Sequence, residues 1–311
     1  MRIGLGATGG GAVAVESGRI IAVCGATGRQ GGAVVRHLLG AGWRVRALTR
    51  DPDATKARPV AELGAQLVRV DMANPTSLEP AFDGAYGVYS VQNPYIGGLG
   101  QEVVQGKNVA TVAQAAGVRH LVYGSAGVGS RSGVGSWDSK LAVEEYIAEL
   151  EIPATILRPM AFMELMTDRA FYPPVSTWHV MPRLMGEERP VTWLAVDDLG
   201  RIAAKAFEDP QGYAGRSIAL TSDVRSLAEC RELWTDVRGR SPRRFPMPVR
   251  LFERVAGLAG PDLTTMWRWL RSGHVPLDTN PTRGILPDAL TVRDWLRHND
   301  EGRNDGRSDG G

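Results

Sequence analysis

Cysteine is scarce in this chain of 311 residues, and neither Cys24 nor Cys230 belongs to a CxxC pair. A disulfide framework and a cysteine-based metal or redox site are therefore not expected. No segment approaches the roughly 20 consecutive apolar residues that span a bilayer, so we expect no membrane contact. The glycine-rich N-terminus lacks the apolar core of a signal peptide, and isolated cysteines suit a reducing compartment. These absences predict a cytoplasmic protein.

Excess charge of one sign is absent as well. The formal net charge is +2, which gives no electrostatic reason to expect a nucleic-acid partner. The basic stretch 238–244 has no interleaved aromatic side chains that could stack on bases, so we interpret it as a solvated loop. The sequence shows no helix-turn-helix or zinc-ligand pattern. We therefore expect neither direct nucleic-acid binding nor a metal site.

What the chain does contain is a regular alternation of short β-rich runs and helical patterns between residues 19 and 159. This alternation is typical of βαβ units in a parallel sheet. The runs are largely apolar, as expected for strands that helices cover on both faces. The predicted strands are residues 20–24, 44–49, 66–70, 87–91, 120–124 and 154–158, and the predicted helices are 30–39, 101–116 and 139–150. The sequence thus predicts an α/β fold with a doubly wound parallel sheet of the Rossmann type.

Prolines interrupt this pattern after residue 159, and the later segments favour a small, mostly helical C-terminal lobe rather than a second sheet. A further strand is expected at 217–220, and helices at 197–207, 227–237, 249–258 and 263–270. We therefore divide the chain into a flexible extension (1–18), a Rossmann domain (19–222), a helical lobe (223–298) and a disordered tail (299–311). Residues 160–190 are expected to contribute to the lobe, which would bind the substrate.

Two glycine patterns compete for the role of a phosphate-binding loop. Gly4, Gly6 and Gly9 match the common dinucleotide fingerprint, but no full strand precedes them and no helical pattern follows. The fingerprint has meaning only between a strand and a helix. We therefore interpret these three glycines as part of the flexible extension.

The second pattern lies between the predicted strand 20–24 and the predicted helix 30–39. Gly25 would permit a tight turn, Gly28 the close approach of a pyrophosphate, and Gly31 the packing of the helix on the strand. The N–H groups at the start of the helix would then bind the phosphates. We predict a dinucleotide site that comprises Gly25, Thr27, Gly28, Arg29, Gln30 and Gly31.

The choice between NAD and NADP depends on the end of the second predicted strand, where NAD-binding folds usually carry an acidic residue. Arg50 stands there instead, and a guanidinium suits a 2′-phosphate. Arg29 would reach the same phosphate, and Asp71 would lie near the adenine. Because Asp51 follows Arg50 directly, NAD(H) stays open as an alternative. We predict that NADP(H) is the preferred cofactor.

The glycine loop, extended to Gly32, resembles the signature of the NmrA-like family, whose members are atypical short-chain dehydrogenases/reductases. Segments 45–50, 105–109, 138–146, 156–159 and 195–200 resemble this family too, so the resemblance covers residues 19–222. It implies a Rossmann core with a small C-terminal substrate lobe, and usually NADP(H). The family includes redox-sensing regulators without catalysis and NAD(P)H-dependent reductases of quinones, dyes and other small molecules.

Typical short-chain dehydrogenases place a tyrosine four residues before a lysine. The phenol exchanges a proton with the substrate, and the lysine holds the nicotinamide ribose. Lys140 is the matching lysine, but Ser136 occupies the tyrosine position, and Ser125 stands where the superfamily has its serine. We predict Lys140 and Ser125 as candidate catalytic residues without the usual proton relay. Hydride transfer to a quinone or a dye does not require that relay.

The remaining site residues are predicted from the strand ends, because ligands bind beyond the carboxyl ends of parallel strands. Gln92 and Asn93 follow the fourth predicted strand and should flank the nicotinamide. Phe162 and Met163 follow the sixth, and we expect them to line a substrate pocket together with Trp193.

Two functions are consistent with these patterns. The first is an NAD(P)H-dependent oxidoreductase that acts on a small quinone-like, dye-like or carbonyl compound. The second is a non-catalytic sensor of NADP(H) that acts through a protein partner. The missing tyrosine favours the sensor, whereas the apolar and aromatic segments after residue 159 favour the enzyme.

Overall fold

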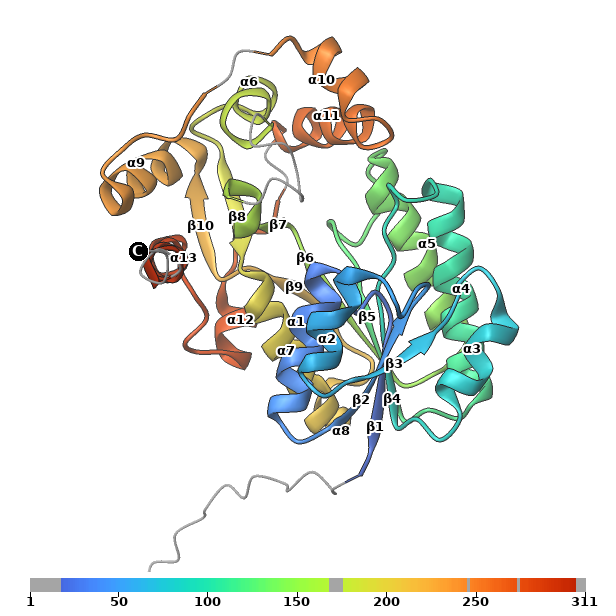
Figure 1. The fold of residues 1–311 in the computed structure, drawn as a ribbon. Helices are drawn as coiled ribbons and strands as arrows, with labels where there is room; N and C mark the ends of the chain where they lie inside the picture. Colours follow the sequence, from blue (N-terminus) through green and yellow to red (C-terminus); the bar gives the residue numbers. More distant parts are fainter. Residues whose placement is uncertain (1–17, 168–175, 245–246, 273–274, 306–311) are drawn as a thin grey trace, which may run out of the picture.

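The computed structural model describes residues 18–167, 176–244, 247–272 and 275–305, with the backbone alone for residues 300–305. A seven-stranded parallel sheet forms its centre, in the order β3-β2-β1-β4-β5-β6-β9 (Figure 1). The strands are β1 (Ile20–Val23), β2 (Arg44–Thr49), β3 (Gln66–Arg69), β4 (Gly87–Ser90), β5 (His120–Gly124), β6 (Ala154–Pro159) and β9 (Ser217–Leu220). The predicted doubly wound parallel sheet is confirmed. Its strand order reverses direction between β1 and β4.

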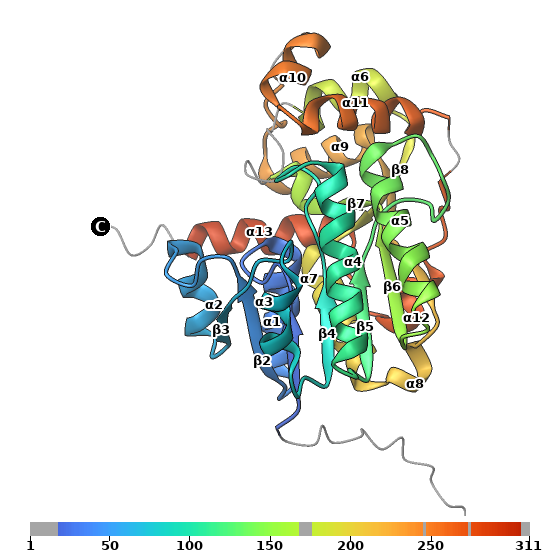
Figure 2. The same ribbon diagram turned by 90° about the vertical axis from the view of Figure 1, so that its right-hand side faces the viewer.

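Helices cover both faces of this sheet, as the apolar strands require. On one face α1 (Arg29–Gly40) packs against α7 (Val196–Glu208). The two helices approach closely because Gly200 has no side chain, and a Cβ there would lie 2.7 Å from the Ala33 carbonyl carbon. The other face carries α3 (Pro75–Phe82), α4 (Leu99–Ala115) and α5 (Gly135–Glu149), and Figure 2 shows this layer of helices facing the viewer. The short elements η1 (Thr55–Ala57), α2 (Arg58–Glu62) and α8 (Pro210–Tyr213) complete this domain.

A smaller lobe lies beyond the carboxyl ends of the strands, at the top of Figure 1. It contains a three-stranded sheet in the order β10-β8-β7, which the expectation of a helical cap missed. The strands are β7 (Ala161–Phe162), β8 (Pro190–Leu194) and β10 (Asp223–Ser226). Strands this short carry almost no local signal, because their formation depends on partners distant in sequence. The rest of the lobe is helical: η2 (Met163–Met166), η3 (Ser176–Val180), α6 (Met181–Met185), α9 (Leu227–Arg238), α10 (Val249–Val255) and α11 (Ala259–Leu270).

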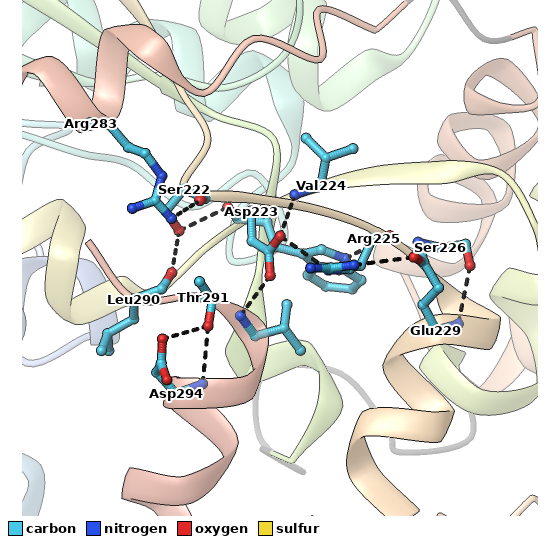
Figure 3. A network of polar contacts seen from close by, with 12 residues as sticks. Ser222, Asp223, Val224, Arg225, Ser226, Glu229, Arg283, Leu290, Thr291 and Asp294 are labelled. Atoms are coloured by element: carbon cyan, nitrogen blue, oxygen red, sulfur yellow. Dashed lines mark hydrogen bonds and ion pairs between the residues drawn. The ribbon is translucent and has the colours of Figure 1, made fainter. Parts of the chain in front are cut away.

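The last part of the chain connects the lobe to the Rossmann domain through α12 (Asn280–Ile285) and α13 (Val292–Asp305). Figure 3 shows the polar network behind this connection. The Asp223 carboxylate accepts the Val292 N–H at 3.0 Å, and the Ser222 hydroxyl donates to the Leu290 carbonyl at 2.7 Å. The Arg283 guanidinium donates to the carbonyl of Ser222 at 2.9 Å. These bonds compensate buried polar groups where the two parts of the molecule meet.

The glycines at positions 4, 6 and 9 lie outside the described residues, as do residues 306–311. Helix α13 continues to Asp305, into the segment from 299 onward for which we expected disorder. Strand β1 begins at Ile20.

Candidate dinucleotide and substrate site

A cavity of about 520 Å³ lies between the carboxyl ends of the parallel strands and the lobe. It opens at the point where the strand order reverses, which is where open α/β sheets bind ligands. The predicted cofactor residues all line it: Gly25, Thr27, Gly28, Arg29, Gln30, Gly31, Arg50, Asp71, Gln92, Asn93 and Lys140. Residues from five separate segments of the chain are thus brought to one cavity.

The glycine loop has the backbone shape that the pattern predicted. Gly25 adopts a φ of +62°, and its carbonyl accepts the Gly28 N–H at 2.8 Å. A Cβ at Gly31 would lie 2.3 Å from the Gly25 carbonyl oxygen, so only glycine fits where α1 leaves the loop. No side chain caps the first turn of α1, and no acidic residue lies in it. The N–H groups at this helix start are therefore suited to a phosphate, and the residues fit a dinucleotide.

Positively charged side chains line the cavity just after the end of β2. Arg50 and Lys56 both line it, and both side chains are exposed. The neighbouring Asp51 and Asp53 are not among the described lining residues, and Arg69 lies 3.7 Å from the Asp51 carboxylate and 3.2 Å from that of Asp53. Sequence reasoning missed Lys56, which only the turn after β2 brings beside Arg50. The two positively charged side chains at this end of the cavity are therefore suited to bind a phosphate group.

Asp71 lines the cavity and also shapes the turn after β3, since its carboxylate accepts the Ala73 N–H at 2.9 Å. Gln92 is buried, and its amide donates to the Ser90 hydroxyl at 2.9 Å. The side-chain oxygens of Gln92 and Gln30 are buried without a hydrogen-bond partner. Because an unpaired buried oxygen is costly, these two amides are suited to bind a ligand in the cavity.

Lys140 reaches the cavity from the first turns of α5. Its ammonium lies 2.8 Å from the Glu102 carboxylate and donates to the Gln92 carbonyl at 3.2 Å. The side chains of both charged residues are almost wholly buried, with 8% of Lys140 and 0% of Glu102 exposed. Sequence reasoning missed Glu102, because nothing local distinguishes it from an ordinary acidic residue at the start of a helix.

Ser125 lines the same wall, but its hydroxyl proton is already used in a hydrogen bond within the protein. The hydroxyl donates to the carboxylate of Glu144, which the Arg158 guanidinium binds in turn. Ser125 therefore presents lone pairs rather than a proton to the cavity. Ser136, in the tyrosine position, also lines the cavity, and its hydroxyl is buried without a partner.

No described tyrosine takes over the missing relay. Tyr89 and Tyr123 are fully buried beneath this wall, and burial raises the pKa of both phenols above its ordinary value. Neither is among the described residues that line the cavity. Tyr95 does line it, but its hydroxyl donates to the Asp262 carboxylate at 2.8 Å. A phenol that donates to a carboxylate is poorly suited to deliver its proton elsewhere.

The far wall is an apolar roof. On α11 the lining side chains recur at the helical spacing i, i+3, i+4 and i+7, and Phe162, Leu165 and Met181 extend the same surface. The α11 side chains are Leu263, Met266, Trp267 and Leu270. Among the described residues of this roof none is charged. Because such a wall offers no compensation for a charge, it suits an uncharged molecule.

Three contacts hold α11 to the Rossmann domain. The Asp262 carboxylate accepts the Ser136 N–H at 3.0 Å as well as the Tyr95 hydroxyl. At the other end of the helix the rings of Trp137 and Trp269 meet edge to face, with 5.1 Å between their centroids. The roof therefore lies directly over the start of α5, where Lys140 is located.

Two of the three predicted substrate-pocket residues need correction. Phe162 lines the cavity, whereas Met163 and Trp193 are fully buried in the core of the lobe and are not among its described lining residues. The Trp193 indole donates to the Arg225 carbonyl at 3.0 Å, which directs the ring across β8 toward β10. Met163 begins η2 and packs into the core of the lobe, so of these two neighbours only Phe162 faces the cavity.

Other classes of site find no support in the described part of the chain. It contains no cluster of three or more histidine, cysteine or acidic residues that could hold a metal ion. Within the same residues no helix has the length and apolar character needed to cross a membrane.

A family model described as the NmrA-like family matches residues 17–291. The chain belongs to the NmrA-like family. One relative is the NmrA-like family domain-containing oxidoreductase malD of Malbranchea aurantiaca, 31% identical over 251 residues, which are 72% of this chain and 74% of the relative. Among solved structures, the negative transcriptional regulator NmrA has a TM-score of 0.75 at 21% identity, over 93% of this chain and 98% of that one.

A second structure of the same fold is the triphenylmethane reductase of Citrobacter sp. complexed with NADP(H). Its TM-score is 0.72 at 20% identity, over 90% of this chain and 99% of the reductase. This NmrA-like protein therefore shares its fold with both a regulator and a reductase.

Proposed function

We propose that this NmrA-like protein is an NAD(P)H-dependent oxidoreductase whose substrate is a small, uncharged, ring-containing compound. The observation that carries the proposal is the continuity of the cavity. One end is the glycine loop at the start of α1, and the other is the uncharged roof of α11. A protein that only senses a dinucleotide has no need of the second end. The malD relative carries the name oxidoreductase, which supports the same conclusion.

The nicotinamide cofactor would supply the hydride that reduces the substrate. Residues 25–31 would bind its pyrophosphate, and Lys140 would donate a hydrogen bond to its nicotinamide ribose. The apolar side chains of α11 and Phe162 would orient the substrate and exclude water from the reacting ring. Because Ser125 donates to Glu144 and Ser136 replaces the tyrosine, substrates that need no strong acid are favoured.

Preference for NADP(H) over NAD(H) is the finer part of the proposal. Arg50 and Lys56 form a positive pair at the end of β2, and the neighbouring acids are bound by Arg69. A 2′-phosphate placed there would meet two cations, whereas a ribose hydroxyl would meet none of the acids that NAD-binding folds use.

The test is transfer of deuterium from 4-deuterated NADPH, and from NADH in parallel, to a panel of quinones, cationic dyes, enones and imines. We expect deuterium in at least one uncharged acceptor, with NADPH binding about tenfold tighter than NADH. The variant Arg50→Ala should narrow that difference. Tight NADPH binding without deuterium transfer to any acceptor would contradict the proposed oxidoreductase activity.

A non-catalytic sensor of NADP(H) that acts through a protein partner is the second candidate. The specific observation in its favour is the lack of an available phenol beside Lys140. The shared fold of the regulator NmrA is consistent with it. Binding without transfer in the experiment above would favour this candidate.

A further inference from the structure

The interface between α4 and α5 contains a carboxylate that the proposed chemistry does not use. Glu102 lies in the first turn of α4, and none of its side chain is exposed. One oxygen pairs with the Lys140 ammonium at 2.8 Å, and the other accepts the Ser139 hydroxyl. The helices can approach this closely because Gly106 lacks a side chain. A Cβ at Gly106 would lie 2.6 Å from a methyl group of Val143.

Stability alone does not explain such a pair. Removing two charges from water is costly, and an apolar pair of the same size is often equally stable or more stable. The location is more informative. Lys140 lines the cavity, whereas Glu102 lies behind it and is not among the described lining residues. The carboxylate can therefore act on a bound molecule only through the lysine.

The partners of the ammonium indicate what that action is. An ammonium has three N–H donors. The ammonium is ion-paired with the Glu102 carboxylate at 2.8 Å and donates one N–H to the Gln92 carbonyl at 3.2 Å, which leaves N–H donors for a ligand in the cavity. The lysine stem is long and flexible, so the ion pair and the hydrogen bond at its tip together determine the direction in which the ammonium faces the cavity.

We propose that Glu102 is a positioning residue that aims a remaining Lys140 N–H at the nicotinamide ribose. This inference rests on the proposed function, since it requires a nicotinamide dinucleotide in the cavity. Ser139 orients Glu102 in turn through its hydroxyl. The three residues form a chain from the core of the helix pair to the cavity wall.

The experiment is a double-mutant cycle read by calorimetric titration with NADPH and with 2′,5′-ADP, which lacks the nicotinamide ribose. Lys140→Ala should weaken NADPH binding roughly tenfold and Glu102→Gln roughly fivefold. The double variant should be no weaker than Lys140→Ala, because Glu102 acts through the lysine. Affinity for 2′,5′-ADP should stay unchanged in all three. In turnover, KM for NADPH should rise while kcat changes little.

Asp198→Asn is the matched control. Asp198 is a buried carboxylate paired with Arg201 at 3.2 Å on α7, and it is not among the described residues that line the cavity. It should lower stability as Glu102→Gln does, yet leave both affinities unchanged. If Glu102→Gln does not fold, Ser139→Ala removes one bond to the same carboxylate and should produce the same selective loss, about twofold.

Several results would overturn the inference. Wild-type NADPH affinity in Glu102→Gln would show that the carboxylate has no positioning role. An equal loss of 2′,5′-ADP would show that the effect is general damage to the site. Wild-type protein that binds neither NADPH nor NADH would remove the proposed function as well, so the two failures are distinguishable.

Discussion

The two ends of the cavity are built in different ways. The phosphate end consists of backbone from the short stretch 25–31, whose shape depends on glycine. The roof consists of side chains from β7, η2, α6 and α11, which are scattered from Phe162 to Leu270. A backbone site tolerates almost no change at a few positions, whereas an apolar wall can be altered in small steps. We therefore expect the cofactor end to respond sharply to substitution and the roof gradually.

Gly31→Ala tests the cofactor end of the cavity and should have the largest effect on ligand binding. Its methyl group would lie 2.3 Å from the Gly25 carbonyl oxygen, so α1 or the loop must move. NADPH affinity should fall about a hundredfold or more, and the free energy of unfolding should fall as well. Titration calorimetry and urea unfolding measure the two effects.

Gly32→Ala is the neighbouring control. There the added methyl group would meet the Ala26 carbonyl oxygen at 3.4 Å, an ordinary contact. Affinity should be retained, and the helix should gain about 0.5–1 kcal/mol because alanine is the better helix former. Equal behaviour of the two alanine variants would show that the shape of the loop is not what limits binding.

Met266→Ala tests the apolar roof of the cavity. This side chain lines the roof but is partly exposed, so its loss should enlarge the pocket without unfolding the lobe. The apparent KM for the acceptor should rise about three- to tenfold, while the Kd of NADPH stays within about twofold. Thr265→Ala, at the exposed neighbouring position, is the control for α11 itself. A parallel change in NADPH affinity would mean that the two ends are not separate.

The smallest effect on ligand binding is expected at Glu164, where the two parts of the molecule meet. Its carboxylate accepts the Val196 N–H at 3.1 Å and the Trp295 indole N–H at 3.2 Å. Burial raises the pKa of Glu164 from 4.5 to about 7, although these hydrogen bonds oppose the shift. The folded protein therefore binds this proton more tightly than the unfolded chain does. The stabilisation is complete below the unfolded pKa and is lost as pH rises through about 7.

Wild-type protein should consequently lose unfolding free energy between about pH 5 and about pH 8, by at most about 1.4 kcal/mol per pH unit. Glu164→Gln should flatten this part of the profile, with NADPH affinity changed by no more than about twofold, because the only described cofactor-site residue whose charge acts on this carboxylate is Arg29. Urea unfolding at a series of pH values measures the slope. Parallel profiles for the two proteins would show that Glu164 does not titrate in this range.

The sequence was informative where function depends on the backbone or on a regular pattern. The apolar runs predicted all strands of the main sheet, since burial on both faces requires them. The positions of Gly25 and Gly31 predicted the loop, because steric limits on the backbone act locally. Arg50 was recognisable because it stands at the end of a strand whose place in the fold could be predicted from the sequence pattern.

Only the tertiary structure decided which side chains from distant segments meet. Lys56 and Arg50 share a wall, Glu102 stands behind Lys140, and Asp262 holds α11 over Ser136. The strands β7 and β10 exist because β8 pairs with both. Met163 and Trp193 turned toward the lobe core rather than the ligand. In each case the deciding energy is packing or pairing between segments that meet only after folding, and no local stretch of sequence contains it.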